Sequence, residues 1–155
     1  MATSAAPAAV DALLAILRAA PGLGGVRVID GPPSNNMTER HRVYVGWSPN
    51  GEQAVDIQQS FASAGARRRD EEGLISCYAE TRAGDKDMSL RRGRAFGIVA
   101  AVEDALRATD AAPEAPTLNG TVLWAQLTTG SLIQESSDTE ALAGLVFTVA
   151  YHARI

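Results

Sequence analysis

The side chains that most often perform catalysis or bind metals are few in this chain, and their spacing does not group them. The single cysteine, Cys77, lies in an apolar alternating run, which predicts a small buried residue and leaves no second cysteine for an intrachain disulfide or a metal cluster. The two histidines, His41 and His152, show no metal-ligand spacing to another histidine or cysteine. The apolar strand neighbours of His152 favour a partly buried or interface residue over a catalytic one.

The sequence also lacks the common enzyme motifs. The glycines at 22, 24 and 25 precede a strand pattern rather than a helix, so they do not form a dinucleotide-binding turn. No Gly-x-Ser-x-Gly sequence is present to place a serine nucleophile on a strand-to-helix turn. We therefore expect a protein that is not an enzyme and that uses no metal and no cofactor.

Candidate contact residues fall into two charged groups. In a glycine-bounded loop predicted over residues 65–73, the first group comprises Arg67, Arg68, Arg69, Asp70, Glu71 and Glu72. Because the acids follow the arginines directly, one interpretation is a solvated tip that neutralises itself, rather than a carboxylate pair for acid–base catalysis. The other interpretation is a contact with a neighbouring subunit or with DNA.

The second group, Arg91, Arg92 and Arg94, lies in the first two turns of a helix predicted over residues 88–109. Positive charge there opposes the helix macrodipole, at a cost of about 0.3–1 kcal/mol per group. Acidic residues just before the helix offset part of this cost. The remainder indicates external anions, either acids of a neighbouring subunit or DNA phosphates, and plain solvent exposure is the alternative.

Charge is unevenly distributed along the chain. The formal net charge is −4 and the pI about 5.1, which disfavours a freestanding DNA-binding domain because such domains need basic surfaces for phosphate contacts. Residues 65–94 contain eight basic and six acidic groups, whereas residues 95–155 contain two basic and seven acidic groups. Such complementary halves suit head-to-tail contacts around a ring of identical subunits. On this hypothesis, changing Arg91 and Arg92 to Glu disrupts assembly and leaves the monomer folded.

The length of 155 residues fits one domain over residues 1–155, with residues 1–6 flexible and residues 110–118 forming an internal linker. Hydrophobic residues make up 46% and aromatic residues 5%, so the core is expected to consist of Ala, Val, Leu and Ile. We recognise neither a secretion signal nor an apolar segment long enough to span a membrane, and we expect synthesis in a reducing cytoplasm.

Hydrophobic periodicity predicts an α+β fold. Helices are expected over residues 7–20 and 88–109, the second capped by Asp85 or Asp87 and buried through Ala95, Phe96, Val99, Val102 and Leu106. Strands are expected over residues 26–30, 42–47, 54–63, 74–81, 121–127, 132–135 and 145–152, with one strand bent at Gly130 as an alternative for 121–135. These elements predict an α/β sandwich, in which a mostly antiparallel sheet of about five to seven strands carries two helices on one face.

Two further features point to partners. The last strand is apolar on both faces, so one face is expected to pack on the helices and the other against another chain. The loop over residues 31–41 is rich in turn formers and offers a docking surface through Ser34, Asn35, Asn36 and Met37.

Several local sequences follow one another in a definite order over nearly the whole chain. They are a short first helix, an early strand leading into Gly31-Pro32, a strand ending in Gly46-Trp47-Ser48, the strand 74–81 running into the Arg-rich helix 88–109, and closing strands ending in Tyr151. In this order the chain resembles the tail terminator (minor tail protein) family of long-tailed bacteriophages.

The resemblance implies a ring, typically a hexamer, on the head-proximal end of the completed tail tube in the virion, assembled in the host bacterial cytoplasm. The implied partners are further copies of the chain, the tail tube protein, the head–tail connector protein and DNA that passes through the lumen without sequence recognition. No membrane, cofactor or catalysis is implied.

Other functions remain as alternatives. The nearest is another head–tail joint protein, such as a stopper or tail completion protein. The second, from a different class, is a small enzyme or anion-binding domain that uses the Arg91, Arg92 and Arg94 group. The third is the cap of a non-viral injection system.

Overall fold

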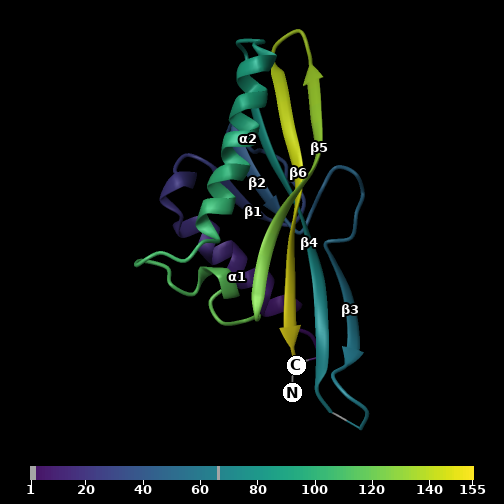
Figure 1. The fold of residues 1–155 in the computed structure, drawn as a ribbon. Coiled ribbons are helices and arrows are strands. Elements are labelled where there is room, and N and C mark those ends of the chain that lie inside the picture. Colours follow the sequence, from purple (N-terminus) through teal and green to yellow (C-terminus); the bar gives the residue numbers. More distant parts are fainter. Residues whose placement is uncertain (1–2, 66) are drawn as a thin grey trace.

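The computed structural model describes residues 3–65 and 67–155 of the chain, and Met1, Ala2 and Ala66 lie outside the described residues. Figure 1 shows a long twisted sheet with both α-helices on one of its faces. In chain order the elements are α1 (Ala6–Ala19), the 3₁₀ turn η1 (Pro21–Leu23), β1 (Arg27–Asp30), β2 (His41–Val45), β3 (Val55–Phe61), β4 (Arg69–Ala83), α2 (Met88–Ala105), the 3₁₀ turn η2 (Ala115–Thr117), β5 (Trp124–Ser136) and β6 (Ala141–Arg154).

In the described residues the sheet has six strands. Five of them follow the order β1-β2-β4-β6-β5, and the sixth, β3, pairs with the same edge of β4 as β2 does, nearer the start of β4. Only β1 and β2 are parallel, and every other pair is antiparallel. The central pair β4–β6 runs in continuous register from Asp70 opposite Arg154 to Ala83 opposite Ala141. The predicted α+β fold, with a mostly antiparallel sheet and two helices on one face, is therefore confirmed.

The core lies between the sheet and the two helices. Alternation directs one set of β4 and β6 side chains towards the helices, because successive side chains of a strand point to opposite faces. Fully or nearly fully buried members of this core are Leu13, Leu17, Val45, Ile75, Cys77, Val99, Val102, Leu145, Phe147, Val149 and Tyr151. As expected from the composition, aliphatic residues predominate. The expectation for Phe96 is wrong, since its side chain points outwards and is 46% exposed.

The opposite face of the sheet is covered over part of its length by a small aromatic cluster. Tyr44 of β2 lies 6.0 Å from Tyr78 of β4 and 5.0 Å from Trp47, measured between ring centroids. Val146 of β6 is buried beneath these rings, and Met37 packs against them. Both α-helices lie on the other face of the sheet (Figure 1), and Leu74 of β4 is exposed.

Both ends of α2 follow from local hydrogen bonds. The Asp87 side chain accepts a hydrogen bond of 3.1 Å from the Leu90 N–H, which confirms the predicted acidic cap. The helix ends at Ala105 rather than near residue 109, because the Leu106 N–H is shared between the carbonyls of Val102 and Glu103 and the chain then turns. Helix ends commonly tighten in this way.

Two other parts of the chain differ from the sequence prediction, and one alternative is confirmed. Within residues 1–6, the described residues Ala5 and Ala6 are buried rather than flexible, and Met1 and Ala2 lie outside the described residues. The predicted linker 110–118 contains η2 and buries Ala115 and Leu118 completely, so it forms part of the core. The alternative of a single strand over 121–135 is confirmed, because β5 is continuous with an irregular register between Thr129 and Leu132.

The predicted loop 65–73 is wrong from Arg69 onwards. Residues 69–73 belong to β4 and pair with β3, and residues 70–73 also pair with β6. β3 ends at Phe61 and β4 begins at Arg69, and Arg67 and Arg68 lie in the β3–β4 turn between them. The charges are accommodated because they alternate across the sheet: Glu71 points towards α1, whereas Asp70 and Glu72 point to the open face beside Arg154 and His152.

Candidate interaction surfaces

Glu71 is a structural residue rather than an exposed contact residue. Its side chain is completely buried, although it carries a carboxylate. One carboxylate oxygen accepts hydrogen bonds from the Tyr151 hydroxyl at 2.7 Å and from the Ala5 N–H at 3.0 Å, and the other accepts from Gln59 Nε2 at 2.6 Å. These donors come from β6, from the start of α1 and from β3, so Glu71 joins elements that are distant in sequence.

The other members of the first charged group are divided between the sheet and the β3–β4 turn. Asp70 is paired with Arg154 across β4 and β6 at 2.8 Å, and Arg69 donates to Gln59 at 2.8 Å. Glu72 is exposed and lies 3.7 Å from His152. Arg67 and Arg68 are exposed in the turn. The structure thus leaves Arg67, Arg68 and Glu72 accessible to a partner.

Arg91 is buried, which contradicts the expectation that it contacts an external anion. Its side chain is 6% exposed, its Nη1 donates to Thr81 Oγ1 at 2.9 Å, and its Nη2 lies 3.6 Å from Asp85. Its Nε has no hydrogen-bond partner within the described part of the chain. Helical spacing places Arg91 on the same face as buried Ala95 and Ile98, and this spacing in the sequence was a signal of burial.

Arg92 and Arg94 are both exposed but differ in surroundings. Arg92 donates a hydrogen bond of 2.8 Å to Gln134 of β5. Arg94 lines a cleft of about 260 Å³ between α2, the segment after α1 and the start of β2; its other lining residues are Gly22, Gly24, Val26, His41, Gly93, Gly97 and Ile98. The sequence showed no signal for this cleft beyond the i,i+4 spacing of Gly93 and Gly97.

His41 gives this cleft its local electrostatics. Its Nδ1 lies 2.9 Å from Thr81 Oγ1. Partial burial lowers the pKa of His41, and the positive charges of Arg94, Arg91 and Arg40 lower it further. The neutral imidazole and the surrounding guanidinium groups therefore favour an anion in the cleft over a cation.

The predicted docking loop is held to the open face of the sheet at one end. Arg42 is buried and donates from Nε to the Glu39 carbonyl at 2.7 Å and from Nη2 to the Met37 carbonyl at 3.0 Å. Met37 itself packs on the aromatic cluster, so it anchors the loop rather than meeting a partner. Ser34, Asn35 and Asn36 remain exposed and available for contacts.

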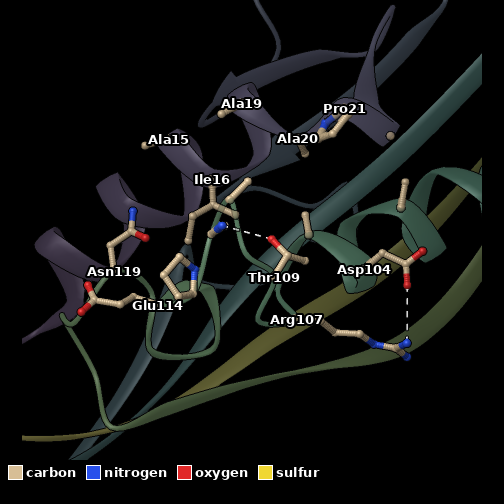
Figure 2. A pocket seen from close by; sticks show the side chains of 16 residues that line it. Ala15, Ile16, Ala19, Ala20, Pro21, Asp104, Arg107, Thr109, Glu114 and Asn119 are labelled. Atoms are coloured by element: carbon tan, nitrogen blue, oxygen red, sulfur yellow. Dashed lines mark hydrogen bonds and ion pairs between the residues drawn. The ribbon is translucent and has the colours of Figure 1, made fainter.

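A larger groove of about 690 Å³ separates the second half of α1 from the C-terminal half of α2, with residues 109–114 forming its third wall. Figure 2 shows Ile16, Ala19 and Ala20 on the α1 side and Asp104 with Arg107 on the other. The lining is mostly methyl groups, and the ion pair between Arg107 and Asp104, at 3.7 Å, lies at its edge. Such a lining can bind apolar groups but offers no nucleophile next to a general base.

Large apolar side chains are exposed on both edges of the sheet and on α2. The exposed fractions are 72% for Phe61 on β3 and 43% for Trp124 on β5. Trp124 stacks on His152 with ring centroids 5.8 Å apart. The other exposed large apolar residues are Ile57, Leu74, Leu90, Phe96, Leu123 and Leu132. Sequence reasoning placed most of these on strands or helices but did not show which would remain uncovered.

The described residues contain neither a metal-binding cluster nor a helix suited to cross a membrane. Nowhere in residues 3–65 and 67–155 do three or more His, Cys, Asp or Glu side chains gather in a way that would hold a metal ion. Within the same ranges, neither α-helix has the length and apolar character that a membrane crossing requires.

The comparisons with known proteins include a similarity to a solved virion structure. No family model matches the chain, and no curated protein matches it. The chain is similar to a chain in a solved structure described as the virion of a native gene transfer agent (GTA) particle. The sequence identity is 16%, the TM-score is 0.48, and the match covers 98% of this chain and 100% of that chain. Values this low assign neither a family nor a function.

Proposed function

We propose that this chain is a structural protein of a phage-like virion that assembles with copies of itself into a ring, typically a hexamer, at the head-proximal end of a tail tube. In this role the ring stops tube polymerisation and offers the docking surface for the head–tail connector. DNA passes through its lumen. The chain acts by binding, without catalysis and without a cofactor.

The observation that carries this proposal is the presence of free strand edges on opposite sides of the sheet. Among residues 3–65 and 67–155, β5 pairs with no strand other than β6, and β3 with no strand other than β4. A free edge presents unpaired N–H and C=O groups that another chain can pair with. Exposed Trp124 and Phe61 add apolar area on these same strands. Each subunit thereby offers different surfaces to two neighbours, which is the requirement for a head-to-tail ring.

The remaining accessible features suit contacts along the axis of such a ring. Exposed polar residues lie in two places: Ser34, Asn35 and Asn36 in the docking loop, and Arg67 and Arg68 in the β3–β4 turn. They offer docking surfaces for a tube protein on one side and a connector on the other. The net charge of −4 disfavours tight binding of DNA that must slide past.

The mass of the purified protein, alone and with tail-tube subunits, tests the ring. We expect a closed oligomer by light scattering or native mass spectrometry, at least in the presence of the tube protein. A chain that stays monomeric under both conditions contradicts the proposal.

Electron microscopy of particles that lack the protein tests its place in assembly. Overlong tails of variable length are the expected result, because nothing then stops tube growth. Tails of normal length with detached heads would instead identify the chain as another head–tail joint protein.

The cleft beside Arg94 favours a second candidate function, a small anion-binding domain. Its lining combines a guanidinium, an imidazole and glycine backbone in about 260 Å³. A saturable rise in melting temperature with a nucleotide or anionic metabolite, lost in Arg94→Ala, would support this function. No rise across such a panel would exclude it.

A further inference from the structure

The cleft beside Arg94 carries positive charge that the chain does not neutralise itself. Arg94 is exposed on the second turn of α2, and Arg40 precedes His41 at the start of β2. Within residues 3–65 and 67–155, no carboxylate forms an ion pair with Arg94 or Arg40. His41, which lines the cleft with Arg94, has a pKa lowered by its partial burial and then by the charges of Arg94, Arg91 and Arg40.

The α2 wall of the cleft is open down to the backbone. A Cβ atom at Gly93 or at Gly97 would meet no other atom within 4 Å. The fold of the single chain therefore does not require glycine at either position, and the space is available to another chain. Phe96, which precedes Gly97 in the sequence, is exposed and adds apolar area to the surface of α2.

An unneutralised acidic segment lies beyond the opposite end of α2. Asp110 and Glu114 are exposed, and in the described part of the chain neither pairs with a basic side chain. Arg107 is already shared between Glu103 and Asp104, at 3.7 Å from each. Figure 1 shows the segment between α2 and η2 extending away from the sheet on the helix side.

The two charged regions cannot neutralise each other within one chain. From Arg94 to the end of α2 at Ala105 the helix rises by about 17 Å at 1.5 Å per residue. Solvent-exposed charges so far apart are largely screened at physiological ionic strength, where the Debye length is about 8 Å. Neutralisation by a second copy is not subject to this distance within one chain.

We propose that the cleft beside Arg94 binds the acidic segment of residues 110–114 from a second copy of this chain. The guanidinium of Arg94 pairs with a carboxylate of Asp110 or Glu114, and the glycine wall of α2 admits the incoming backbone. This inference rests on the proposed ring, because a contact between one end of α2 and the other end in the next copy repeats head to tail.

Charge exchange tests this contact through the oligomeric mass at fixed ionic strength. Arg94→Glu and the double variant Asp110→Arg/Glu114→Arg should each raise the concentration for half-assembly by more than about tenfold, because a close charge pair becomes repulsive. The combination of all three substitutions in one chain should restore assembly. Arg92→Glu is the matched control. Because Arg92 lies outside the cleft and donates to Gln134, we expect this variant to assemble like wild type, in place of the sequence-based hypothesis that changing Arg92 disrupts assembly.

A substitution that fills the cleft gives a second test without reversing a charge. Gly97→Leu places a side chain in open space and improves helix propensity, so the monomer should fold with an unchanged or higher melting temperature. The same variant should lose assembly.

The outcomes separate this inference from the proposed function. If wild type assembles and Arg94→Glu or Gly97→Leu assembles equally well, the contact is overturned and the ring stands. A second combination of results also overturns the contact. In it, Arg94→Glu weakens binding of a DNA fragment, and the chain with all three substitutions does not regain assembly. The cleft would then be a phosphate site. A wild-type chain that stays monomeric with tube subunits overturns both.

Discussion

The hydroxyl of Tyr151 lies 2.7 Å from a carboxylate oxygen of Glu71. Through this oxygen, which also accepts from the Ala5 N–H, strands β4 and β6 are joined to the start of α1. Glu71 is fully buried and Tyr151 is 1% exposed. A buried carboxylate is costly unless several donors surround it. Here the Ala5 N–H and Gln59 provide the additional donors, so the site is satisfied although it lies in the core.

This arrangement predicts loss of stability in acid. Burial acts to raise the pKa of Glu71, but hydrogen bonds from Gln59, Tyr151, Ser4 and Ala5 outweigh it and hold the pKa below the ordinary value of 4.5. A lowered pKa in the folded chain contributes stability that is present above pH 4.5 and is lost as the pH falls through the lowered value. Chemical denaturation from neutral pH to about pH 3 should therefore show a decrease in unfolding free energy.

The matched variant for this test is Glu71→Gln. It should be less stable at neutral pH by about 1–3 kcal/mol, because an amide cannot accept all of these hydrogen bonds. It should also depend less on pH between about 5 and 3. Identical pH dependence in the two proteins would show that Glu71 does not control the acid response.

Arg91 and Arg92 are neighbours in sequence, but substitution by Glu should change the stability of the chain by very different amounts at the two positions. Arg91→Glu places a carboxylate beside Asp85 in a site that is 6% exposed, and we expect a loss of about 3–5 kcal/mol in the free energy of unfolding. Arg92→Glu changes an exposed group and should stay within about 0.5 kcal/mol of wild type. Urea denaturation of both variants measures this difference, and equal losses would contradict the burial of Arg91. The sequence predicted that both changes leave the monomer folded; from the burial of Arg91 we now expect this only of Arg92→Glu.

Glycines at different places should respond oppositely to alanine. A Cβ at Gly73 would overlap the ring of Tyr151, so Gly73→Ala should destabilise the chain by about 1–3 kcal/mol. A Cβ at Gly93 meets open space within a helix, so Gly93→Ala should stabilise the monomer by up to about 1 kcal/mol. Thermal unfolding of the two variants should give shifts of opposite sign, and a downward shift for both would show that α2 is packed more tightly than described.

The fold was largely predictable because periodicity reports which face of an element is buried. The alternation around Ile75 and Cys77, and that of Leu145, Phe147 and Val149, located the two central strands. The extent of β4 was not predictable in the same way. Charges at residues 69–72 are typical of a turn, and the donors Ala5, Gln59 and Tyr151 make a buried Glu71 favourable there.

The candidate site was predictable only in part, for a related reason. Composition identified an arginine-rich start of α2 but gave the same weight to Arg91, Arg92 and Arg94. Their orientations separate them, since Arg91 faces the sheet and Arg94 faces the cleft. The cleft itself joins residues near 22, 41 and 94, which are brought together by packing rather than by any local pattern.

Cys77 gives a direct probe of the closed core. The thiol is fully buried, and burial raises its pKa to about 12. Because the thiolate is the reactive form, the native protein should not react with a thiol reagent at mildly alkaline pH. Labelling should appear only when the sheet separates from the helices, so the labelling rate in increasing denaturant should follow global unfolding. The unfolded chain in high denaturant is the control for full reactivity. Rapid labelling of the native protein would show that the core between β4 and the helices opens locally, which would contradict a core that stays closed around Cys77.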